Sequence, residues 1–137
     1  METRVKEKEI TIKVRMSEDT VTVRQTVRQW ARELDFSLID QTKIVTAASE
    51  LARNMIDFAG GGVMHMEIVN RDGRKGMKLT FRDQGPGIAD MELALTNGYT
   101  TRGGLGLGLS GAKRLVNEFD ISSQVGKGTE VTIIRWK

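Results

Sequence analysis

The sequence predicts an α+β fold, a two-layer sandwich in which one mixed, mostly antiparallel sheet carries helices on one face. Apolar residues recur at helical spacing in three long segments, and they alternate with polar residues in five shorter ones. Glycine-containing turns at Asp72-Gly73 and at 126–129 join four of the short segments in pairs, which is typical of antiparallel hairpins. The expected order is strand, helix, helix, strand, strand, helix, loop, helix, strand, strand.

The N-terminal half is expected to contain one strand and two helices. Residues 10–14 alternate apolar and polar side chains, as a half-buried strand does. Residues 17–20 offer helix-start chemistry, and a second helix is expected to begin after Ser37 and to end near Ala59, ahead of three glycines. The two apolar stripes are Val23, Val27, Trp30, Ala31 and Leu34, then Ile44, Ala48, Leu51, Met55 and Phe58.

The C-terminal half is expected to contain two hairpins and the remaining helices. Alternating residues at 64–68 and 77–81 flank the Asp72-Gly73 turn, so they predict the first hairpin. Trp30 and Trp136 are expected to anchor the core or its edge. The other predicted elements are a short helix at 90–96, a mobile loop at 97–106, a helix at 107–119, and strands at 121–125 and 130–136.

Composition limits both the size and the class of the protein. The 137 residues suit a single domain, 1–137, whose first eight residues are expected to be a loose extension. The absence of cysteine excludes disulfides and thiolate sites and fits a cytoplasmic location. A net charge of +3 is too small to argue for DNA, and 5% aromatic residues disfavour single-stranded nucleic acid. No apolar run is long enough to cross a membrane.

Asp83 is the first candidate site residue. By the alternation of its strand it falls on the same face as Met77, Leu79 and Phe81, where an unpaired carboxylate is costly. Gly85 and Gly87, on either side of a proline, would let the backbone approach a flat ligand closely. The alternative is an ordinary strand end, with an aspartate that turns into solvent or caps the next turn.

A glycine-rich string at 103–109 precedes a predicted helix. Successive unhindered amides at a helix N-terminus form an anion site, which the helix dipole strengthens. The string does not follow a strand within a βαβ unit, so a dinucleotide fold is disfavoured, and the lysine of the P-loop signature is absent. The glycines either cradle phosphates in another kind of site or simply form a flexible loop.

Glu50 and Asn54 lie one helical turn apart and therefore share a face of the second helix. An amide oxygen is a suitable ligand for Mg²⁺, and a carboxylate nearby can accept a proton from an attacking hydroxyl. The alternative is an ordinary Glu50–Arg53 surface pair beside a solvated asparagine.

Four short sequences, in this order, together resemble the GHKL ATPase and kinase superfamily with its Bergerat-type ATP pocket. Within it the chain is most similar to the small serine kinases of the anti-sigma type, which include the stressosome switch kinases. The resemblance extends from about Glu18 to Trp136. The four matching sequences are Ser-Glu-Leu-Ala-Arg-Asn at 49–54, Asp-Gln-Gly-Pro-Gly-Ile at 83–88, Gly-Leu-Gly-Leu-Gly-Leu at 104–109 and Gly-Lys-Gly-Thr at 126–129.

The resemblance implies a role for each of these residues. Asp83 would bind the adenine amino group, Asn54 would hold Mg²⁺, and Glu50 would be the catalytic base. Arg102 is the nearest cation for the terminal phosphate, in a loop shorter than that of sigma-binding relatives. The other residues implied in nucleotide binding are Gly85, Gly87, Gly104, Leu105, Gly106, Leu107, Gly108 and Thr129.

The implied activity is a protein serine/threonine kinase that uses ATP and Mg²⁺. Its implied substrates are STAS-domain proteins, RsbS- or RsbR-like components of a stressosome, and a downstream phosphatase could be activated by contact. The alternative is a non-catalytic regulator, such as an anti-sigma factor, with ATP as a structural ligand. A stripped-down ATPase ranks lower. Arg24, Arg28 and Arg32 recur every fourth residue, which indicates either a docking face for an acidic partner or a plain solvated face.

Overall fold

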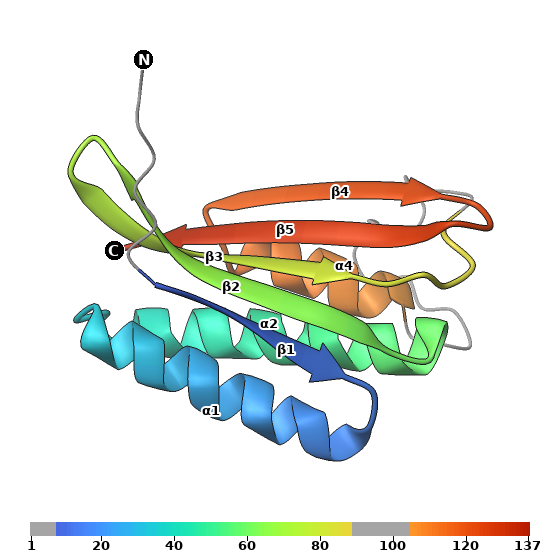
Figure 1. The fold of residues 1–137 in the computed structure, drawn as a ribbon. Helices are drawn as coiled ribbons and strands as arrows, with labels where there is room; N and C mark the ends of the chain where they lie inside the picture. Colours follow the sequence, from blue (N-terminus) through green and yellow to red (C-terminus); the bar gives the residue numbers. More distant parts are fainter. Residues whose placement is uncertain (1–7, 89–104) are drawn as a thin grey trace.

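The computed structural model describes residues 8–88 and 105–137, except for the side chains of 105–108. Five strands form one sheet in the order β1-β2-β3-β5-β4, and every pairing is antiparallel. The three described helices lie on one side of the sheet (Figure 1), which confirms the predicted two-layer α+β fold. The elements are β1 Glu9–Val14, α1 Ser17–Glu33, α2 Leu38–Ala59, β2 Gly62–Arg71, β3 Arg74–Arg82, α4 Leu105–Arg114, β4 Glu118–Gln124 and β5 Gly128–Trp136.

Helix α2 begins and ends where the sequence predicts, and α1 begins where predicted. The Asp19 carboxylate accepts hydrogen bonds from the backbone N–H groups of Arg15 (2.8 Å) and Met16 (3.1 Å) just before α1. The Ser37 hydroxyl accepts the N–H of Asp40 at the start of α2. Gly60 ends α2 with φ 76°, a left-handed conformation that favours glycine.

The hairpin between β2 and β3 has the predicted two-residue turn. Asp72 and Gly73 have φ angles of 54° and 80°, which identify a type I′ turn. The Asn70 side chain accepts the N–H of Gly73 at 3.1 Å. This turn sets the register of the pair, from Arg71 opposite Arg74 to Val63 opposite Arg82.

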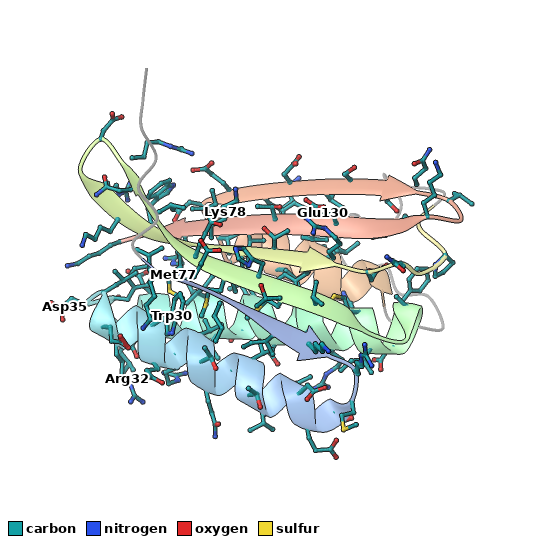
Figure 2. All side chains as sticks on the ribbon, in the orientation of Figure 1. Trp30, Arg32, Asp35, Met77, Lys78 and Glu130 are labelled. Carbon is teal, nitrogen blue, oxygen red and sulfur yellow. The ribbon has the colours of Figure 1, made fainter. Side chains whose placement is uncertain are left out.

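The main core lies between the sheet and the helices, and it contains both predicted apolar stripes. Figure 2 shows Trp30 pointing from α1 toward the sheet, where Met77 also lies. A smaller apolar cluster of Val69, Ile134 and Trp136 covers part of the opposite sheet face. Both tryptophans are buried, as predicted. No helix within residues 8–88 and 105–137 is long and apolar enough to span a bilayer.

The bounds predicted for the last helix, 107–119, are wrong. It begins two residues earlier than expected, at Leu105, and ends at Arg114 rather than near Phe119. The chain leaves the helix because pairing with β5 offers other partners: Asn117 N–H donates to Ile134 O at 3.0 Å, and β4 begins at Glu118. The predicted short helix at 90–96 lies outside the described residues, as does most of the loop predicted at 97–106.

Candidate functional site

Asp83 lies directly after β3, half-buried, and is held by the backbone around it. Its Oδ1 accepts the N–H of Gly85 at 2.9 Å and that of Thr129 at 3.2 Å. Its own N–H donates to Thr129 O at 3.0 Å. Oδ2 makes no hydrogen bond within the described residues. One oxygen therefore caps the next turn, as in the structural alternative.

The glycines of this corner permit close contact between chain segments. A Cβ on Gly87, where φ is 79°, would lie 2.4 Å from Gln124 O. A Cβ on Gly128, where φ is 122°, would lie 2.1 Å from Asp83 O, and one on Gly85 would lie 2.5 Å from Ala59 Cβ. The sequence predicted close approach to a ligand at Gly85 and Gly87, whereas the close approach in the structure is to protein atoms. Contact with a purine there stays a prediction.

Ser123 in β4 completes the corner, although the sequence analysis missed it. Its Oγ accepts the N–H of Ile88 at 2.7 Å and is hydrogen-bonded to Thr129 Oγ1 at 2.8 Å. Gly126 N–H donates to Pro86 O at 2.8 Å beside it. The signal that could have found Ser123 is the hairpin register, which places it opposite Thr129. The loop at 83–88 and the β4–β5 hairpin therefore behave as one unit.

Glu50 and Asn54 share one face of α2. Asn54 is 8% exposed and Glu50 is half-buried. They stand about 6 Å apart along the helix axis, given the rise of an α-helix. Helix α4 packs against α2 and contributes the buried residues Leu109 and Ala112. The predicted pair is therefore at the rim of the core, as expected, rather than in bulk water.

The first turn of α4 contains four of the predicted phosphate-binding residues, 105–108. The first N–H groups of an α-helix have no partner inside the helix, so they can bind an anion. Because α4 begins at Leu105, residues 105–109 of the glycine-rich string belong to the helix instead of preceding it. Arg102 and Gly104, also predicted to bind nucleotide, lie outside the described residues.

Among the described residues, Asp83 lines two cavities that do not include Asn54. One of about 550 Å³ lies between Arg15, the glycines 60–62 and Arg82, and the other, of about 300 Å³, lies beside the β4–β5 turn. Neither cavity joins Asp83 to Asn54, so a common nucleotide pocket for the two residues stays a prediction. A hollow of about 650 Å³ near Asp35 and Gly73 contains none of the predicted site residues.

Comparison with known families decides the class of the chain. The profile of the histidine kinase-, DNA gyrase B- and HSP90-like ATPases matches residues 39–137. The chain belongs to this GHKL family. The match includes all four sequences that carried the resemblance, from residues 49–54 to 126–129. As a GHKL protein the chain binds ATP, as predicted.

Relatives of this GHKL protein include kinases and anti-sigma factors. It is 48% identical over 118 residues to the serine/threonine-protein kinase RsbT of Bacillus subtilis, covering 86% of this chain and 89% of the relative. It is 30% identical over 128 residues to an anti-sigma F factor of Geobacillus sp., covering 88% and 86%. The predicted enzyme class is confirmed: the chain is a protein serine/threonine kinase of the partner-switching type, and the non-catalytic alternative is less well supported.

A solved structure supports the GHKL fold independently. The RsbU and RsbW domains of Rv1364c from Mycobacterium tuberculosis superpose with a TM-score of 0.62 at 23% identity, covering 98% of this chain and 32% of that one. At this identity the similarity concerns the fold alone.

His65 lies apart from the site, on the sheet face away from the helices. Its Nδ1 is hydrogen-bonded to Thr11 Oγ1 at 2.8 Å, and its Nε2 lies 3.3 Å from Glu67 Oε2. Within the described ranges no cluster of three or more His, Asp or Glu side chains has the geometry of a metal site. An Mg²⁺ ion held by one amide and by phosphates would not need such a cluster.

Proposed function

We propose that this GHKL kinase forms one domain over residues 1–137 and transfers the γ-phosphate of Mg²⁺-bound ATP to a serine or threonine of a STAS-domain protein. The reaction serves a bacterial stress-signalling partner switch in the cytoplasm. The observation that carries the proposal is Asp83, whose Oδ1 is occupied by two backbone amides while Oδ2 makes no hydrogen bond within the described residues.

The purine binds at the corner around Asp83. Oδ2 accepts a hydrogen bond from the adenine amino group, which guanine lacks at that position. The amides of Gly85 and Thr129 donate to Oδ1 and hold the carboxylate in one orientation, with Oδ2 as the acceptor for the ligand. Thr129 and Gly87 line the same slot, and the bonds of Ser123 hold both segments in register.

The phosphates bind between α2 and the start of α4. Backbone amides of residues 104–108 hold the phosphate oxygens, and Arg102 supplies the nearest side-chain cation. Asn54 contributes an amide oxygen to Mg²⁺, which neutralises phosphate charge when bound. Glu50 takes the proton of the substrate hydroxyl as its oxygen attacks the γ-phosphorus, and ADP leaves with the electrons of the broken P–O bond.

The partner is acidic where it meets α1. Arg28 is hydrogen-bonded to Gln41 Oε1 at 3.5 Å, whereas Arg24 and Arg32 have no ion-pair partner in the described part of the chain. Figure 2 shows Arg32 pointing away from the sheet, into solvent. Like charges at four-residue spacing cost some helix stability, and an acidic surface would offset that cost. RsbS- and RsbR-like STAS proteins are the candidates.

A second function is contact-based regulation of an output enzyme or a sigma factor. Two anti-sigma F relatives favour it, because they share 30% and 32% identity with this chain over 88% and 84% of its length. Phosphoryl transfer needs the Glu50 carboxylate, whereas binding to a partner does not. The two functions therefore separate by mutation.

The decisive experiment uses ATP labelled at the γ-phosphate with the STAS-domain proteins of the same genome. We expect label on one serine or threonine, and a loss of at least about a hundredfold in rate for Glu50→Ala. Asp57→Ala is the matched control, because Asp57 is an exposed acid on the same helix. Absence of label on every STAS protein would refute the proposal, as would full activity in Glu50→Ala.

A further inference from the structure

One buried arginine joins both helices of the proposed nucleotide site at the end opposite Asp83. Arg135 lies on β5 with its side chain toward the helices, and only 13% of that side chain is exposed. Its Nη1 donates to the backbone oxygen of Leu115 at 2.9 Å, and its Nη2 donates to Asp40 Oδ1. A single guanidinium thus connects the start of α2, the end of α4 and the sheet.

Each anchor is a helix terminus. Leu115 follows the last residue of α4, where carbonyl groups lack partners inside the helix and attract cations. Asp40 lies in the first turn of α2, where a carboxylate is favoured by the helix dipole. The Arg135 guanidinium holds the pKa of Asp40 below its ordinary value, and the Ser37 hydrogen bond acts in the same direction.

We propose that Arg135 is a positioning residue for nucleotide binding, which fixes α4 against α2 through Leu115 and Asp40. This inference rests on the proposed function. Helix α2 carries Glu50 and Asn54, and α4 begins with the phosphate-binding residues 105–108. The relative placement of these two helices sets the separation between the metal ligand and the phosphate-binding amides. Errors of about 1 Å in such a separation can cost up to a hundredfold in rate.

The bonding of Arg135 indicates a geometric role beyond stability. Its Nε is buried and has no hydrogen-bond partner among the described residues. A buried N–H group without a partner and a half-buried ion pair both lower the free energy of unfolding. A well-packed apolar side chain at this position would avoid both costs. An apolar side chain could not, however, donate hydrogen bonds to a carbonyl and a carboxylate at once, as the planar guanidinium of Arg135 does.

The test compares Arg135→Gln, Arg135→Lys, Asp40→Asn and the Arg135→Gln/Asp40→Asn double variant in the full chain. Affinity for Mg²⁺–ATP is measured by calorimetry, KM and kcat by phosphorylation of a STAS protein, and stability by melting. We expect Arg135→Gln and Asp40→Asn each to weaken ATP binding and raise KM by about tenfold, with a smaller change in kcat. A lysine can reach only one of the two groups, Leu115 O or Asp40, so ATP binding and KM in Arg135→Lys should lie between those of the unaltered protein and Arg135→Gln. The double variant should be no worse than Arg135→Gln alone.

Arg71→Gln is the matched control, because Arg71 also pairs with a carboxylate, that of Glu118, and has no hydrogen bond or ion pair to α2 or α4 among the described side chains. Its KM for ATP should not change. A lowered melting temperature with unchanged ATP affinity in Arg135→Gln would overturn the proposal, and so would additive effects in the double variant. If the unaltered protein bound no ATP, the proposed function would fail instead. Amide hydrogen exchange in α4 would then still decide the positioning role: faster exchange in Arg135→Gln than in Arg71→Gln supports it, and equal exchange refutes it.

Discussion

Two junctions at opposite ends of the fold, the corner at Asp83 and the contact made by Arg135, are held by different kinds of interaction. The corner at Asp83 is held by backbone hydrogen bonds, by bonds from the short Asp83 and Ser123 side chains to backbone N–H groups, and by glycines, at Gly87 and Gly128, whose missing side chains let two segments touch. The opposite junction is held by side chains, above all the Arg135 guanidinium between Leu115 O and Asp40. A backbone contact fails abruptly when a Cβ is added, whereas a side-chain contact can be weakened in steps.

This difference matches the task proposed for each junction: the Asp83 corner would bind the purine directly, whereas the Arg135 junction would place α4, whose opposite end would bind phosphate. Recognition of a purine needs one fixed acceptor, so a rigid corner is suitable. Phosphate binding depends on the placement of a helix that must accommodate substrate entry and product release, and a side-chain link can be tuned for that purpose. The following predictions test this difference between the Asp83 corner and the Arg135 junction, from the largest expected effect to the smallest.

Gly128→Ala should have the largest effect. The added Cβ would lie 2.1 Å from Asp83 O, and φ is 122°, a conformation that alanine rarely adopts. We expect a loss of roughly 3–5 kcal/mol in the free energy of unfolding, measured with urea. Gly111→Ala is the control: it lies inside α4 with nothing within 4 Å, and it should gain about 0.5–1 kcal/mol. Equal effects would show that the corner is not rigid.

Asp83→Asn should abolish nucleotide recognition while the corner stays folded. The amide oxygen can still accept the N–H groups of Gly85 and Thr129, but a donor replaces Oδ2 where the adenine amine needs an acceptor. We expect at least about a hundredfold weaker Mg²⁺–ATP binding in calorimetry, or about 2.7 kcal/mol. Unchanged affinity would remove Asp83 from the site.

Ser123→Ala should have an intermediate effect, because it removes one of several links that hold the corner, while the backbone bonds and those of Asp83 remain. The N–H of Ile88 loses its acceptor and Thr129 Oγ1 loses its partner. We expect a loss of about 1–2 kcal/mol of unfolding free energy. If the loss equals that of Gly128→Ala, then side chains govern both ends. Ser122→Ala on the exposed position next to it is the control and should be near neutral.

The opposite junction should be sensitive to acid. The folded pKa of Asp40 is lowered, so its contribution to stability is complete above the ordinary carboxyl pKa of about 4 and is lost as pH falls toward the folded value. Asp40→Asn should therefore be less stable than the unaltered protein at pH 6, and this difference should shrink below pH 4. Urea unfolding at several pH values measures it. A difference independent of pH would mean that the ion pair does not contribute.

The smallest effect is expected at an exposed ion pair near the Asp83 corner. Arg82 Nε lies 2.9 Å from Glu130 Oε2, but the two side chains are 62% and 44% exposed. Solvent screens such a pair, so Arg82→Gln should cost at most about 0.5 kcal/mol. A larger loss in thermal unfolding would show that this side chain supports the corner.

The sequence alone determined those parts of the molecule that depend on local periodicity and turn chemistry. Helix α2 ends at Ala59, ahead of the glycines, as predicted, and Asp72-Gly73 forms the predicted tight turn. The four family sequences identified the GHKL fold and kinase class. Glu50 and Asn54 fall on one helix face because four residues make about one turn.

Tertiary structure decided what depends on pairing between distant segments. The helix predicted to reach Phe119 ends at Arg114 because Asn117 and the strand after it bond to β5, a preference that no local pattern reveals. Ser123 reaches Ile88 across 35 positions, and Arg135 reaches Asp40 across 95. A side chain's partner across such distances is set by sheet register and helix packing, so its role became visible only when the chain was folded.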